Sequence, residues 1–130
     1  MAYLGENIPK LGFGFMRLPM IGEDVDIEQT IQMVDLFMKK GFTYFDTAYP
    51  YHNQKSEGAV KRCLVERYER EQFYLADKMP MWKPKTNEDF YEIFEEQLGR
   101  CGVEYFDYYL LHDMNQERYE KYEKFDCFNW

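Results

Sequence analysis

The side chains of this sequence best suited to chemistry recur at nearly constant intervals. Asp46, Lys78 and His112 follow one another at 32 and 34 residues, and Gly14 precedes Asp46 by a further 32. A carboxylate, an ammonium and an imidazole brought together can orient a polar substrate, stabilise developing charge and move a proton. Tyr51 follows Asp46 by five residues and adds a phenol that can donate a proton.

The interval matches the length of a strand-helix unit, roughly 30 residues. Four short segments rich in aromatic, β-branched or glycine residues are predicted to be strands, and each of the spaced residues lies at or just past the end of one. The segments are residues 11–16, 42–45, 72–76 and 105–111. Their nearly continuous apolar character is typical of a parallel sheet covered on both faces.

Amphipathic helices are predicted to follow these strands. They are expected over about residues 27–40, 56–68, 87–101 and a stretch after residue 114. Asp26 is placed to cap the first helix, and Thr86 with Asp89 resembles a capping box at the third. Gly41 and Gly102 are expected to end these two helices.

The resulting β-α order predicts a parallel α/β fold, either an open doubly wound sheet or a barrel. No G-x-G-x-x-G pattern follows the first predicted strand, which disfavours the open dinucleotide-binding sheet. The sequence therefore favours a (β/α)8 TIM-barrel type. Because such a barrel takes about 250 residues, four βα units in residues 1–130 are expected to form a single partial domain, a half-barrel or truncated barrel.

Composition excludes several classes of function. A net charge of −8, with acids and bases interspersed, argues against a nucleic-acid partner. No run of about 18 apolar residues is present, so no membrane span is expected. Three cysteines that are far apart and form no C-x-x-C pair suggest neither a disulfide framework nor a metal site. A reducing, cytoplasmic location fits best.

Taken singly, none of the spaced residues indicates a site. An Asp or Lys at a strand end is commonly a turn or cap residue, and a His at a barrel rim is commonly structural. One Tyr among twelve means nothing alone. Their regular spacing favours a site, because the carboxyl ends of barrel strands converge on one face. This reasoning assigns no role to His52.

A family resemblance strengthens this interpretation. The segment DTAYPY at residues 46–51 resembles the D-T-A-x-x-Y signature of the aldo-keto reductases. Further matches are residues 11–19, residues 56–58, Lys78 and residues 107–112, so that the resemblance covers nearly the whole chain.

The resemblance implies a catalytic tetrad of Asp46, Tyr51, Lys78 and His112. In the family, NADPH delivers hydride to a carbonyl carbon while the Tyr, here Tyr51, gives a proton to the oxygen. Lys78 would strengthen this phenol as an acid, Asp46 would offset the cost of keeping Lys78 charged, and His112 would orient the carbonyl.

The same resemblance implies the binding residues. Gly14, Phe15, Met16 and Asp46 are expected to contact the NADP cofactor. The substrate pocket would be lined by two aromatic residues, for which core packing is an equally good interpretation: Tyr49 and Trp82.

The expected function is thus NADPH-dependent reduction of aldehyde or ketone carbonyls to alcohols, with a small-molecule carbonyl substrate. The family's later strands, which hold most of the cofactor, lie beyond this chain. Two alternatives stay open: a catalytically silent half-barrel that acts as an interaction or regulatory module, and a half completed by another chain. Exposed half-barrel edges also predict a homo-oligomer.

Overall fold

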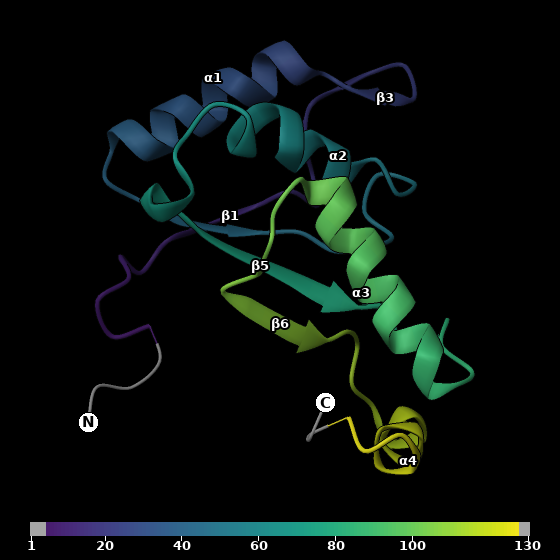
Figure 1. The fold of residues 1–130 in the computed structure, drawn as a ribbon. Helices are drawn as coiled ribbons and strands as arrows, with labels where there is room; N and C mark the ends of the chain where they lie inside the picture. Colours follow the sequence, from purple (N-terminus) through teal and green to yellow (C-terminus); the bar gives the residue numbers. More distant parts are fainter. Residues whose placement is uncertain (1–4, 128–130) are drawn as a thin grey trace.

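The computed structural model describes residues 5–127, which are built around a four-stranded parallel sheet (Figure 1). The strands follow one another across the sheet in chain order. They are β1 (Gly12–Gly14), β4 (Tyr44–Asp46), β5 (Tyr74–Met79) and β6 (Tyr108–Leu111). A doubly wound sheet would reverse its strand order part-way across. Sequential order is what a barrel requires, and the predicted fold class is confirmed.

Each of the four strands is followed in the chain by a helix, and α1, α2 and α3 lie on the same side of the sheet (Figure 1). The helices are α1 (Ile27–Lys39), α2 (Ser56–Val60), which continues as the π-helical turn η1 (Lys61–Val65), α3 (Asn87–Cys101) and α4 (Gln116–Lys124). A two-stranded antiparallel ribbon, β2 (Met20–Ile21) with β3 (Asp24–Val25), precedes α1 and was not predicted.

The predicted ends of α1 and α3 match the structure closely, whereas the second helix, expected over residues 56–68, is α-helical to Val60 and ends as a π-helical turn at Val65. The side chain of Asp26 accepts a hydrogen bond from the backbone N–H of Gln29 at 3.0 Å. Thr86 and Asp89 form a reciprocal capping box at the start of α3. Gly102 ends α3 in the left-handed conformation, with φ of 72°, where an L side chain is disfavoured.

All four strands begin one to three residues later than expected, and for two of them the structure gives the reason. Gln72 belongs to the 3-10 turn η2 (Arg70–Gln72), where its side chain caps the backbone N–H of Glu69, so β5 starts at Tyr74. Before β6, the carboxylate of Asp107 accepts hydrogen bonds from Arg70 and from the backbone N–H of Leu75. These bonds hold residue 107 at the sheet edge, before the ladder begins.

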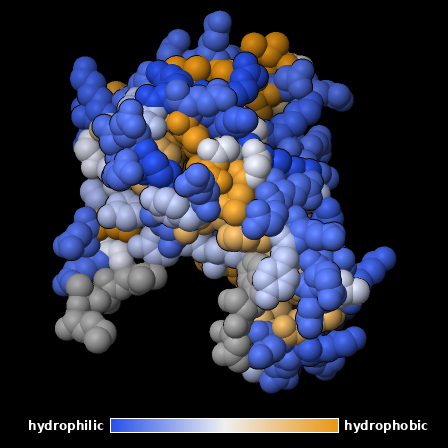
Figure 2. All heavy atoms as spheres, in the orientation of Figure 1, coloured by the Kyte–Doolittle hydropathy of each residue, from blue (hydrophilic) through white to orange (hydrophobic). Residues whose placement is uncertain are grey.

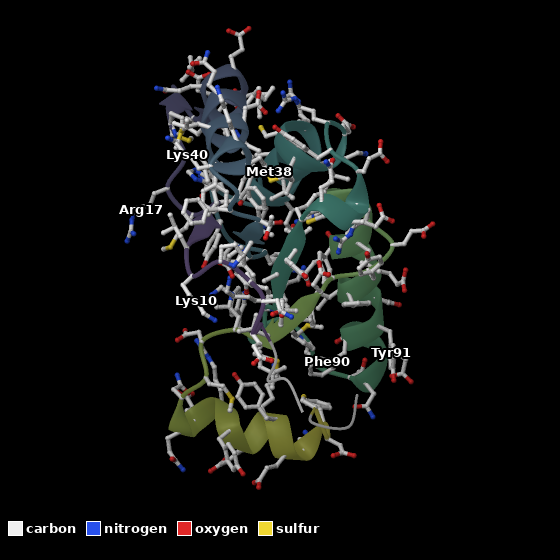
Figure 3. The ribbon with its side chains drawn as sticks, turned by 90° about the vertical axis from the view of Figure 1, so that its left-hand side faces the viewer. Lys10, Arg17, Met38, Lys40, Phe90 and Tyr91 are labelled. Carbon is white, nitrogen blue, oxygen red and sulfur yellow. The ribbon has the colours of Figure 1, made fainter. Side chains whose placement is uncertain are left out.

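The core lies between the sheet and its helices. Along each strand, alternate side chains face the helices, as the period of two requires. A first cluster packs α1, α2 and η1 on the sheet; its largest buried members are Phe15, Phe45, Leu64 and Leu75. A second cluster joins α3 and α4 to the end of β5: Met79, Met81, Phe90, Ile93 and Tyr122. In Figure 3, Met38 marks α1, and Phe90 and Tyr91 mark the first turns of α3.

The opposite face of the sheet is only partly covered. The rings of Tyr44 and Tyr108 lie 5.6 Å apart between their centroids. Leu110 remains 44% exposed and Tyr74 38%. We expected a sheet covered on both faces, and among the described residues only the helix face is fully covered. Figure 2, in the orientation of Figure 1, shows apolar side chains in orange at the surface of the side that faces the viewer, among hydrophilic ones in blue.

Two glycines near the end of α3 should respond oppositely to the same substitution. Gly102→Ala should lower the free energy of unfolding by about 1 kcal/mol, because alanine is strained at the positive φ of this cap. Gly99→Ala should raise it by about 0.5–1 kcal/mol, since a Cβ there meets no atom within 4 Å and the residue lies inside the helix. Urea unfolding monitored by circular dichroism measures both, and shifts of equal sign would contradict the cap assignment.

Candidate active site

The site is built at the carboxyl ends of the parallel strands. Asp46 ends β4 and pairs with Ala76 of β5 rather than with Lys78. Lys78 lies two residues further along β5, on the same face and roughly 7 Å beyond Ala76. The long side chain of Lys78 spans this offset, and its Nζ lies 2.6 Å from Oδ1 of Asp46.

The ammonium of Lys78 is held by two oxygens. Besides Asp46, it donates to the backbone carbonyl of Thr47 at 2.7 Å. Its side chain is only 14% exposed, against 31% for that of Asp46. A charge so poorly solvated is costly unless it is paired and hydrogen-bonded. Two of the three ammonium donors are thus satisfied inside the protein, and the ammonium lies 5.2 Å from the ring centroid of Tyr51.

The loop that carries Tyr51 has a strained backbone. Three successive residues after it, His52, Asn53 and Gln54, adopt positive φ values of 51°, 51° and 67°, a conformation that costs on the order of 1 kcal/mol or more per residue. The loop is tied down by His52, whose Nε2 accepts a hydrogen bond at 3.0 Å from the backbone N–H of Leu18. His52, which the sequence left without a role, anchors the Tyr51 loop to the segment after β1.

His112 comes directly after β6 and meets the other site residues through its ring. Its centroid lies 6.0 Å from that of Tyr51, with the rings perpendicular at 88°, and 5.4 Å from Trp82. Burial lowers the pKa of His112, and the positive charge of Lys78 lowers it further. The imidazole is therefore neutral at neutral pH, the form that can both donate and accept a hydrogen bond.

The predicted cofactor residues differ in their accessibility. Gly14 pairs with Asp46, and a Cβ added to it would meet no atom within 4 Å. Met16 is 49% exposed. Phe15, by contrast, is fully buried in the helix-side core, and its backbone N–H donates to the carbonyl of Asp46 at 2.8 Å. These contacts do not support a cofactor role for the Phe15 side chain.

The two predicted pocket residues also differ in exposure and in contacts. Trp82 is 45% exposed and lies beside His112. Tyr49 is 5% exposed, its hydroxyl accepts a hydrogen bond from Lys83, and the guanidinium of Arg100 lies 4.7 Å from its ring centroid. Tyr49 therefore contacts α3 and the loop before it, and none of these contacts involves Asp46, Tyr51, Lys78 or His112.

A buried polar cluster behind Lys78 escaped the sequence analysis. Glu57, Asp77 and Gln97 are each fully buried. The available signal was their position, because a carboxylate stands within the apolar run of β5 and an amide within the apolar stripe of α3.

The whole arrangement resembles known proteins. The model of the aldo/keto reductase family matches residues 10–126. An aldo-keto reductase from Mycobacterium sp. (strain KMS) is 31% identical over 110 residues, which are 83% of this chain and 36% of the relative. An NAD(P)H-dependent D-xylose reductase from Pyricularia oryzae is 32% identical over 111 residues, 83% of this chain and 32% of that protein. The chain thus spans about a third of the length of these curated relatives.

Solved structures show the same fold. An aldo-keto reductase from Klebsiella pneumoniae in complex with NADPH superposes with a TM-score of 0.70 at 24% identity, covering 92% of this chain and 42% of that one. A second Klebsiella pneumoniae structure, with NADP and acetate, gives a TM-score of 0.66 at 26% identity with the same coverage. Four βα units covering about two-fifths of these barrels are consistent with a half-barrel.

The effect of Lys78 on the pKa of His112 can be tested by substitution. Lys78→Met should raise the pKa of His112, because the substitution removes a nearby positive charge and leaves Asp46 unpaired. Proton NMR titration resolves this, since the chain contains two histidines. His52, whose pKa is lowered by burial alone, is the internal control and should not move. A His112 titration unchanged by the substitution would refute the coupling.

Proposed function

Because the chain belongs to the aldo/keto reductase family, we propose that it carries the catalytic tetrad of an NADPH-dependent reduction of aldehyde or ketone carbonyls to alcohols. One observation carries the proposal: Asp46, Lys78, Tyr51 and His112 meet at the carboxyl ends of three adjacent parallel strands. Active sites of this architecture are built at that end.

The residues present fit a nicotinamide cofactor at one edge of the site. The space beside Gly14 is open, because a Cβ added there would meet no atom within 4 Å, and the absence of a side chain keeps this space free for a ligand. Met16, two residues later, is exposed. Nδ1 of His112 is buried without a hydrogen-bond partner in residues 5–127, which fits a site that a bound molecule completes. Gly14, Met16 and Asp46 would contact the cofactor. The relatives above, a structure in complex with NADPH and an NAD(P)H-dependent reductase, support NADP or NAD as its type.

When bound, the reduced nicotinamide supplies the hydride that reaches the carbonyl carbon. The protein itself supplies the proton. Tyr51 gives the proton of its phenol to the carbonyl oxygen, and the ammonium of Lys78, near the ring, favours the phenolate that remains. Asp46 and the carbonyl of Thr47 keep Lys78 charged. His112, as a neutral imidazole, donates to the carbonyl oxygen and stabilises the charge that develops there.

The substrate is a small carbonyl compound, and Trp82 supplies one wall of its pocket. The support is the contact of the Trp82 ring with His112 and its large exposed area. Tyr49 is retained as a predicted pocket residue, although its contacts with Lys83 and Arg100 favour packing. The silent interaction module is the weaker candidate, because a chain without turnover has no need to keep a buried ammonium beside a phenol and an imidazole.

We further propose that residues 1–130 act as one partial domain, the N-terminal half of the barrel, and that its unpaired edges lead to self-association. The outer strands β1 and β6 each pair with one neighbour in the described sheet, and an open strand edge is a template for pairing. A reducing, cytoplasmic setting suits the three free cysteines. Within residues 5–127, no helix is long and apolar enough to cross a membrane.

Tyr51→Phe tests the proton donor. In the assembly that reduces carbonyls, kcat should fall by ~10²- to 10⁴-fold, the usual contribution of general acid catalysis, while NADPH binding stays close to unchanged because the ring is retained. NADPH oxidation with a panel of aldehydes measures the rate, and fluorescence titration measures the binding.

Tyr49→Phe, two residues earlier, is the matched control. It removes a hydroxyl that accepts from Lys83, and should cost some stability but little kcat. Equal losses of kcat in the two variants, or more than about a tenth of the rate left in Tyr51→Phe, where general acid catalysis predicts at least ~10²-fold loss, would remove Tyr51 from the proposed role.

Self-association is tested by light scattering after size exclusion. The wild-type chain should elute above its 15.9 kDa monomer mass, since a twofold pairing would cover the open sheet. Leu110→Glu places a charge on the exposed side of β6 and should shift the population toward monomer. A wild-type chain that runs as one sharp 15.9 kDa species contradicts the proposal.

A further inference from the structure

Gln97 of α3 reaches the sheet at the point where β4 and β5 separate. β4 ends at Asp46, which pairs with Ala76, and β5 continues beyond this pair. The carbonyl of Ala76 accepts a hydrogen bond at 3.0 Å from the backbone N–H of Thr47, the residue after β4. Residues two apart in a parallel strand direct their N–H and carbonyl groups to the same neighbouring strand. The backbone groups of Lys78 therefore face the side on which β4 has ended.

Side chains take the place of the strand at Lys78. Oδ1 of Asp77 accepts a hydrogen bond from the backbone N–H of Lys78 at 2.7 Å, and Nε2 of Gln97 donates to the backbone carbonyl at 3.1 Å. The carbonyl of Thr47 accepts from the ammonium of Lys78. The separation of the strands thus leaves the Thr47 carbonyl available for the ammonium, while side chains satisfy the backbone groups of Lys78.

Gln97 uses its whole amide in this arrangement, and its side chain is fully buried. Besides the bond to Lys78, Nε2 donates to Oε1 of Glu57 at 2.8 Å, and Oε1 accepts from the hydroxyl of Tyr109. An amide has two N–H donors and one oxygen, so each of these groups has a partner. The orientation is fixed, because exchange of the amide nitrogen and oxygen would set oxygen against the oxygens of Glu57 and Lys78.

The carboxylate that holds Gln97 is itself anchored. Glu57 is fully buried, and its Oε2 accepts from the guanidinium of Arg100 at 3.1 Å. A buried carboxylate is stable when it is paired and hydrogen-bonded, so Glu57 offers Gln97 an acceptor at a fixed position. α2 and α3, which carry these residues, are neighbours on the helix side of the sheet (Figure 1).

We propose that Gln97 is a positioning residue of the candidate site, which completes the backbone hydrogen bonding of Lys78 beyond the end of β4 and fixes the point from which the lysine side chain reaches Asp46. The effect on turnover rests on the proposed function, whereas the effect on the position of the ammonium does not. Because the bond acts on the backbone of Lys78, its loss moves the ammonium relative to Tyr51 and His112 and leaves those side chains in place.

The first test uses the wild-type chain. NMR should show slow solvent exchange of the side-chain amide protons of Gln97, and a scalar coupling through the hydrogen bond between its Nε2 and the carbonyl carbon of Lys78. Gln32, which is exposed, is the reference for a freely exchanging amide. Gln97 protons that exchange as fast as those of Gln32 would mean that the amide makes no lasting bond to Lys78, and would overturn the proposal.

Two uncharged substitutions separate positioning from packing. Gln97→Met keeps the side-chain length and removes both donors, whereas Tyr109→Phe removes only the hydroxyl that donates to Gln97. The titration of His112 reports the position of Lys78, whose charge contributes to lowering the pKa of His112. Gln97→Met should shift this pKa toward its value in Lys78→Met, and Tyr109→Phe should leave it unchanged. No shift in Gln97→Met, or equal shifts in both variants, would reduce Gln97 to a packing residue.

A double variant isolates the bond to Lys78. Glu57→Gln combined with Gln97→Glu exchanges the amide and the carboxylate, so that position 57 donates to position 97 and both Arg100 and Tyr109 keep an acceptor. Only the carbonyl of Lys78 loses its donor. The double variant should melt closer to wild type than Gln97→Met does, because Gln97→Met leaves several buried polar groups unpaired.

Turnover then gives the decisive contrast. Both Gln97→Met and the double variant should lower kcat by about 10- to 10²-fold with KM nearly unchanged, since a displacement of about 1 Å can cost 10²-fold. A double variant that recovers kcat together with its melting temperature overturns the proposal. If Gln97→Met does not fold, the wild-type exchange and the double variant decide. If wild type shows no turnover, the proposed function fails, while the amide exchange and the His112 titration still decide the inference.

Discussion

The ion pair between Lys78 and Asp46 is the interaction on which the rest of the site depends. An ammonium that is 14% exposed is stable there because a carboxylate lies 2.6 Å away and a backbone carbonyl 2.7 Å away. With its charge fixed at that point, Lys78 sets the electrostatics of its neighbours. It lies 5.2 Å from the Tyr51 ring and lowers the pKa of His112.

Two consecutive residues of β5, Asp77 and Lys78, have different roles because they point to opposite faces of the sheet. The alternation along β5 sends Lys78 to the site and Asp77 to the helix-side core. The placement of Lys78 and the packing of the core are thereby coupled through one residue, since Asp77 and Gln97 of the polar cluster contact the backbone N–H and the backbone carbonyl of Lys78. The same alternation separates Phe15 and Phe45, which fill the core, from Gly14 and Asp46, which border the site.

The sheet also explains why family membership and activity are separate questions for this chain. The family model covers residues 10–126 and the four candidate site residues meet within them, while the chain spans about a third of its curated relatives. A barrel buries the inner face of its sheet by closing on itself. Here that face carries partly exposed large side chains, among them Tyr74 and Leu110. The candidate site is local to four βα units, whereas a closed (β/α)8 barrel takes eight.

The sequence by itself determined the order of the elements, several of their caps and the placement of the candidate site residues at strand ends. Helix ends at Asp26, Thr86 and Gly102 depend on local hydrogen bonds and backbone angles, which neighbouring residues dictate. The near-constant interval between site residues places them at strand ends because each βα unit takes about the same length of chain. The helix ends depend on neighbouring residues and the strand ends recur at a regular interval, so both can be predicted from the sequence.

Only the tertiary structure decided how those residues meet. The register that pairs Asp46 with Ala76, and leaves Lys78 to reach back to it, is set by the sheet as a whole. Strand parity removed the side chain of Phe15 from the site, and the contact of His52 with the backbone of Leu18 crosses 34 residues of chain. Gln97 of α3 joins α2 to β5 in the same way, because its amide donates both to Glu57 and to the backbone carbonyl of Lys78. Such contacts depend on which faces of separate elements pack together, and no spacing along the chain encodes that choice.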